Sequence, residues 1–110
     1  MVNWDRVRTL REEVGAEDFD EIIELFFTEV GNVVEALPFV ESAKAMADQL
    51  HFLKSGALNL GFDGLSDLCS HGEATANEGT MDGIDVEAVQ QSYYDAKAHF
   101  HAHQNNKLSS

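Results

Sequence analysis

A histidine, a lysine and a run of small residues lie close together near the middle of the chain and could carry chemistry. His51 precedes Lys54 by three positions, and Ser55, Gly56 and Ala57 follow directly. If this segment is helical, Lys54 lies about one turn from His51 on the same face. A neutral imidazole nitrogen is a nucleophile that can carry a phosphoryl group, and a nearby ammonium can neutralise the charge on that group. These residue types at this spacing are therefore suited to phosphoryl transfer.

The apolar pattern around His51 indicates that its side chain faces away from the core. Apolar residues recur at steps of three and four, and the helix that they predict ends at Gly61; they are Ala43, Met46, Leu50, Leu53, Ala57 and Leu60. Their mean direction lies roughly 130° from His51 on a helical wheel. We therefore expect an exposed His51, ringed by a partner-binding surface made of Ala47, Ser55, Leu58 and Phe62. Gly56 weakens a helix, so its presence predicts close packing at that point.

The elements that must position this segment are helical too, because no long segment alternates with a period of two. Capping and stop signals give the expected bounds of five helices. The first covers 4–14, between Asn3 and Gly15, and the second runs from the cap pair Asp18 and Glu21 to Pro38. The third covers 43–60, the fourth runs from a cap at Asp63 to about Ala76, and the fifth begins at a cap at Asp85. We predict an all-α fold, an antiparallel up-down four-helix bundle with a short additional N-terminal helix. Residues 1–104 form its single domain, and residues 105–110 are expected to be a disordered polar tail.

Length and composition limit the classes of protein. The chain has 110 residues, 44% of them hydrophobic, with 7 Lys and Arg against 20 Asp and Glu and a net charge of −13. This composition argues against a disordered chain and against a nucleic-acid partner. No apolar run approaches the ~20 residues of a membrane helix, the N-terminus lacks a signal-peptide pattern, and Cys69 has no second cysteine to pair with. We expect a cytoplasmic monomer without a membrane partner.

The segment from His51 to Gly61 resembles the motif of the histidine phosphotransfer (HPt) domains of multistep phosphorelays. That motif is a histidine, a lysine three positions on, small residues, and a glycine ten positions after the histidine, as at His51, Lys54, Ser55 to Ala57 and Gly61. The resemblance covers residues 3 to about 100 and includes segment 10–19 and the positions of Leu65, Leu68, Cys69 and Glu73. Two features depart from the family: Ser55 precedes Gly56 where most members have the reverse order, and Glu73 stands where glutamine is common.

The resemblance implies a phosphocarrier rather than an autonomous kinase. His51 would accept a phosphoryl group from a receiver-domain aspartate and pass it to another receiver, with Lys54 stabilising the charge. Glu73 would orient the imidazole, although its carboxylate would also repel the phosphoryl group. The implied partners are response-regulator receiver domains and a hybrid histidine kinase. Receivers supply Mg²⁺, so no cofactor of its own is expected for this chain.

Other functions stay open or are disfavoured by particular residues. A phosphorylation-independent module that binds or inhibits receivers would need the same surface, and the sequence does not separate it from a carrier. A kinase dimerisation helix would have an acidic residue after the histidine, where this chain has Phe52, and a di-iron bundle needs more than the single pair Asp48 and His51. His99 and His103 share a helix face, but two imidazoles without a third ligand make a weak site, so we interpret this segment as part of a frayed polar tail and expect no metal there.

Overall fold

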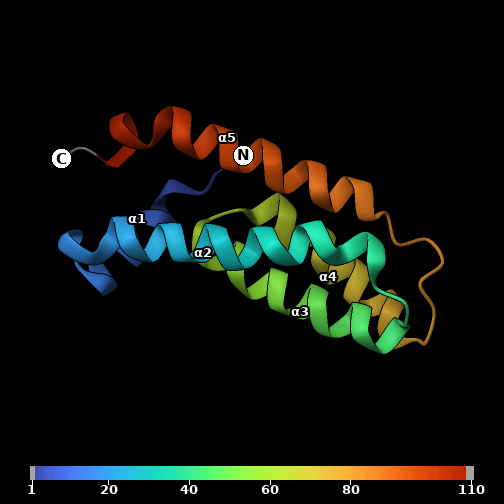
Figure 1. Ribbon diagram of the computed structural model, residues 1–110. Helices are drawn as coiled ribbons and strands as arrows, with labels where there is room; N and C mark the ends of the chain where they lie inside the picture. The colour runs from blue at the N-terminus through green and yellow to red at the C-terminus, as the bar shows by residue number, and fades with distance from the viewer. Residues whose placement is uncertain (1, 109–110) are drawn as a thin grey trace.

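The computed structural model describes residues 2–108, and helices account for most of them (Figure 1). Within this part of the chain there are five α-helices, one 3₁₀ turn and no strand. They are α1 (Trp4–Val14), α2 (Ala16–Ala36), η1 (Leu37–Phe39), α3 (Ala43–Leu60), α4 (Asp63–Asn77) and α5 (Val86–Leu108). The prediction of an all-α fold is confirmed.

Helices α2 to α5 form an antiparallel up-down bundle, elongated with extents of 46 × 20 × 19 Å. Each helix packs against the next in the chain, and α5 closes the bundle by returning to α2. The short α1 packs on α2, α3 and α5, and Figure 1 shows it at the end of the bundle where α5 finishes. The short extra helix thus covers one end, as the sequence predicts.

Local signals explain most of the helix boundaries. The Asn3 side chain accepts a hydrogen bond from the backbone N–H of Arg6, and Gly15 ends α1 with a φ of +89°. The Ser42 hydroxyl accepts from the N–H of Ala45 at the start of α3. At the start of α5, the Asp85 carboxylate accepts from the N–H of Ala88 at 2.9 Å, as expected of a cap.

Two expected caps are wrong. Helix α2 begins at Ala16 rather than after Asp18, because Gly15 ends α1 and also occupies the N-cap position of α2. Asp18 therefore lies inside the first turn, where its N–H donates to the carbonyl of Gly15. Asp63 is the first residue of α4 and does not cap it. Its carboxylate instead accepts from the Asn3 side chain at 3.1 Å and ties α4 to the start of α1.

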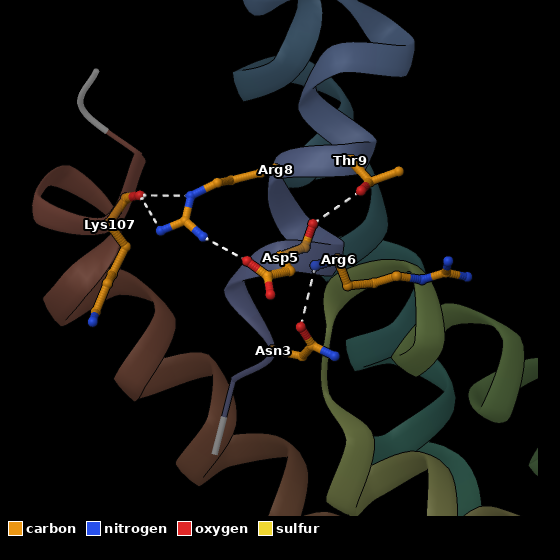
Figure 2. Close-up of polar contacts among 6 residues, drawn as sticks. All are labelled: Asn3, Asp5, Arg6, Arg8, Thr9 and Lys107. Atoms are coloured by element: carbon orange, nitrogen blue, oxygen red, sulfur yellow. Dashed lines mark hydrogen bonds and ion pairs between the residues drawn. The ribbon is translucent and has the colours of Figure 1, made fainter.

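The predicted disordered tail is also wrong for residues 105–108, because α5 continues to Leu108. Figure 2 shows the reason: the Arg8 guanidinium reaches from α1 and donates to the carbonyl of Lys107 at 3.0 and 3.2 Å. Asp5 holds the same guanidinium at 3.0 Å, and Leu108 packs against the core. The last turn is thus stabilised from outside its own helix. Residues 109–110 of the expected tail lie outside the described residues.

Candidate functional site

His51 projects from the middle of α3 into solvent, as its place on the helical wheel predicts. Its side chain is 64% exposed, whereas Leu50 and Leu53 beside it are fully buried. Helix α3 therefore presents the imidazole at the surface, where another protein can reach it.

A carboxylate from the neighbouring helix bridges the histidine and the lysine. Oε2 of Glu73 on α4 lies 2.8 Å from Nδ1 of His51, and Oε1 lies 2.7 Å from Nζ of Lys54. The side chain of Glu73 is only 16% exposed, and that of Lys54 is 29% exposed. The resemblance implies the contact between Glu73 and the imidazole. The bond between Lys54 and Glu73 was not anticipated, because it depends on how α4 packs against α3.

A glycine next to Glu73 sets the distance between these two helices. A Cβ at Gly72 would lie 2.7 Å from Cδ1 of Leu50, the residue before His51. Because no side chain separates them there, the α4 backbone comes close to α3 at the level of the imidazole. Nothing in the sequence alone indicates that Gly72 positions Glu73.

The two glycines of the motif are structural, as expected. A Cβ at Gly56 would lie 2.8 Å from Cγ2 of Val30, so Gly56 allows α2 to approach α3 closely. Gly61 ends α3 in the left-handed conformation with a φ of +75°, and its carbonyl accepts from the N–H of Asn3 at 2.7 Å.

The electrostatic environment keeps Glu73 ionised. The hydrogen bond from Lys54 is the main cause that lowers the pKa of Glu73; partial burial opposes it, and the hydrogen bond with His51 adds to it. Below this cluster, burial and the charge of Glu73 raise the pKa of Cys69 to about 12, against the opposing effect of Lys54. Cys69 is therefore a neutral, buried thiol at neutral pH and acts as a small core residue.

The carboxylate also determines which ring nitrogen can react. An ionised carboxylate only accepts hydrogen bonds, so the 2.8 Å contact requires a proton on Nδ1 of His51. The lone pair of a neutral imidazole is then on Nε2. The nitrogen available as a nucleophile is the one that does not contact Glu73.

The surface around His51 differs in part from the prediction. Ser55 and Leu58 are exposed, and Leu58 is 42% exposed. Phe62 is fully buried, because the left-handed Gly61 turns the chain so that its ring packs near Phe27 with centroids 6.1 Å apart. Ala47 is also buried in the core. Phe62 and Ala47 therefore do not belong to the exposed surface around His51.

Sequence reasoning missed one apolar residue of this surface. Phe52 directly follows His51 and is 42% exposed. The available signal was its position outside the apolar stripe of α3, on the same side as the histidine. Phe52, Ser55 and Leu58 are among the exposed residues near His51 on α3, and we call these three the α3 docking surface.

The structure is a helical bundle that holds an exposed histidine against a partly buried carboxylate of the neighbouring helix. The protein-family model of the Hpt domain matches residues 5–99, a range that includes His51, Lys54 and Glu73. The chain therefore belongs to the Hpt domain family, whose members act in phosphotransfer of two-component signalling and interact with receiver domains. Comparisons with curated proteins and with solved structures gave no match. No helix among the described residues is long and apolar enough to span a membrane.

Proposed function

We propose that this protein accepts a phosphoryl group on Nε2 of His51 from a receiver-domain phosphoaspartate and passes it to the aspartate of another receiver. The observation that carries the proposal is the exposed imidazole with Nδ1 held by Glu73 at 2.8 Å. Membership of the Hpt family supports phosphoryl transfer as the reaction. The contact between Nδ1 and Glu73 supports Nε2 as the reacting atom.

In the accepting step, the lone pair of Nε2 attacks the phosphorus of the aspartyl phosphate. The N–P bond forms, the P–O bond breaks, and the aspartate leaves as a carboxylate. In the donating step, the acceptor carboxylate attacks phosphorus and the N–P bond breaks. Because Nδ1 keeps its proton, the leaving group is neutral imidazole rather than an imidazolate. Glu73, which accepts that proton's hydrogen bond, acts as the residue that orients the ring in both directions.

Lys54 resolves the repulsion expected between Glu73 and the phosphoryl group. Its ammonium lies 2.7 Å from Oε1 of Glu73, so the pair has no net charge next to His51. A carboxylate without this partner would oppose the arrival of a phosphoryl group. We propose that Lys54 offsets the Glu73 charge and contributes positive potential to the transferring group, while the receiver supplies Mg²⁺ and its remaining catalytic groups.

The α3 docking surface is the proposed contact with the receiver. Phe52 and Leu58 offer apolar area for contact. The side chain of Ser55 between them is small, so it leaves room for a partner to approach the imidazole ring. A convex helix of this kind fits a concave active site. The proposed setting is the cytoplasm, where the protein would act as a monomeric carrier and a hybrid histidine kinase could be its first donor.

Label transfer tests the function. The chain is incubated with a receiver domain phosphorylated with labelled phosphate, and label on the chain is measured with time. We expect the parent protein to be labelled and His51→Gln to remain unlabelled. His71→Gln is the matched control, because His71 is an exposed histidine on α4, and it should be labelled like the parent.

The assignment is wrong if His51→Gln is labelled as fast as the parent. Stable binding of receivers by the parent, with no label transferred from any of them, would instead favour a phosphorylation-independent binding module. Measuring receiver binding and label transfer on the same samples therefore distinguishes the two functions.

A further inference from the structure

Two histidines near the end of α5 form a pair outside the phosphotransfer site. The rings of His99 and His103 have centroids 4.3 Å apart and planes inclined at 41°. The sequence predicts a frayed end here, but α5 continues to Leu108 and Arg8 holds its last turn. An ordered helix therefore keeps both imidazoles on one face.

Their spacing is that of a helical metal chelate. Residues four apart lie on the same side of an α-helix, and histidines at this spacing bind zinc in helical sites. A ligating imidazole must be neutral.

We propose that His99 and His103 together bind one divalent transition-metal ion of the Zn²⁺, Ni²⁺ and Cu²⁺ group, with water in the remaining coordination positions. Imidazole nitrogen suits these ions, whereas Mg²⁺ and Ca²⁺ prefer oxygen ligands. Among residues 2–108, no three His, Cys, Asp or Glu side chains gather as a metal site. The ion is thus held by two protein ligands and exchanges with solvent, unlike a closed structural zinc.

The pair lies beside the only tryptophan of the chain, which links the site to α1. The Trp4 ring is 6.3 Å from that of His99 and stacks on Phe100 at 5.3 Å. An ion bound by His99 and His103 would cross-link two successive turns of α5 at the place where α1 packs against it. Metal binding should therefore stabilise this end of the bundle against unfolding and change the fluorescence of Trp4.

Trp4 fluorescence and thermal unfolding test the proposal on the untagged chain. Titration with Cu²⁺ or Ni²⁺ should quench Trp4 to a saturating level at about one ion per chain, and Zn²⁺ should raise the melting temperature. Mg²⁺ should do neither. The Mg²⁺ experiment is needed because a chain with a net charge of −13 attracts any divalent cation to some degree.

Three variants locate the site. His103→Gln, at an exposed position, should abolish saturable quenching and the Zn²⁺ effect. His101→Gln is the matched control, because its ring lies near Phe27 at 5.1 Å and not in the pair; it should bind like the parent. His51→Gln should also bind like the parent, which separates this site from the imidazole and carboxylate on α3 and α4. The proposal is overturned if His103→Gln titrates like the parent, or if Mg²⁺ reproduces the effects of Zn²⁺.

Discussion

At the scale of single residues, the central feature is a carboxylate shared between a base and a cation. Glu73 accepts from Nδ1 of His51 with one oxygen and from Lys54 with the other. A glutamine in its place has one accepting oxygen and an amide that only donates. If its oxygen accepted from Lys54, its NH2 group would donate to Nδ1 of His51 and leave the proton of the neutral imidazole on Nε2. The choice of glutamate therefore has consequences for transfer and for stability.

Glu73→Gln should slow phosphoryl transfer by about tenfold, equivalent to about 1.4 kcal/mol of barrier. The physical reason is that a neutral amide does not balance the charge of Lys54 and, where it donates to Nδ1, leaves the ring proton on the reacting Nε2. Single-turnover transfer from a phosphorylated receiver measures the rate. Glu78→Gln removes an equal charge from the exposed end of α4 and should leave the rate unchanged. Equal rates for Glu73→Gln and the parent would contradict the positioning role.

The same substitution should change how stability depends on pH. The pKa of Glu73 is below its ordinary value of 4.5, so between the folded and unfolded values the unfolded chain binds the proton more readily. The contribution of this carboxylate is therefore complete above pH 4.5 and is lost as pH falls through the lower folded value. The parent should exceed Glu73→Gln in free energy of unfolding near pH 7, and denaturant titrations should show this difference shrinking as the pH falls below 4.5. A gap that widens on acidification would refute this account.

At the scale of elements, glycines decide how closely the helices of the site approach one another. Gly72 brings α4 against α3, and Gly56 brings α2 against the opposite side of α3. Helix α3 is thus fixed from two directions while its outer face stays free for His51.

Gly56→Ala should destabilise the bundle although alanine favours helix. The new Cβ would lie 2.8 Å from Cγ2 of Val30, and overpacking of this kind costs about 1–3 kcal/mol, more than the gain of up to ~1 kcal/mol from helix propensity. Chemical denaturation measures the difference. Gly64→Ala on α4 is the control, because a Cβ there meets nothing within 4 Å, and it should be neutral or stabilising. A stabilised Gly56→Ala would show that α2 and α3 can separate without cost.

At the scale of the whole molecule, charge is unevenly distributed. Three of the 7 basic residues lie on α1 as Arg6, Arg8 and Arg11, and Lys54 is the only one between Lys44 and Lys97. The chain has 20 acidic residues, and most of them lie outside α1. Since isolated surface ion pairs contribute little, repulsion among the acidic side chains outweighs them.

Added salt should therefore raise the melting temperature. The Debye length falls from about 30 Å at 0.01 M to about 10 Å at 0.1 M, which screens repulsion along a molecule 46 Å long. Thermal unfolding in increasing NaCl at neutral pH measures the effect. The same titration near the isoelectric point of about 4.5, where net charge is small, should give a smaller rise. A melting temperature that falls with salt at neutral pH would mean that attractive pairs dominate instead.

The sequence by itself determined the helices and the direction of His51. Apolar residues at steps of three and four define the buried face of each helix, and a residue far from that face must be exposed. Caps at Asn3 and Asp85 and the stops at Gly15 and Gly61 fixed several boundaries for the same local reason.

Only the tertiary structure decided which groups from different helices meet. The bond between Lys54 and Glu73, the burial of Phe62 and the ordered end of α5 under Arg8 all join residues far apart in the chain. Periodicity specifies which face of a helix is buried, but not how closely or at what level two helices pack. Here that level depends on the missing side chain of Gly72, which leaves room for Leu50 of α3. This close approach exists only once the two helices are packed together.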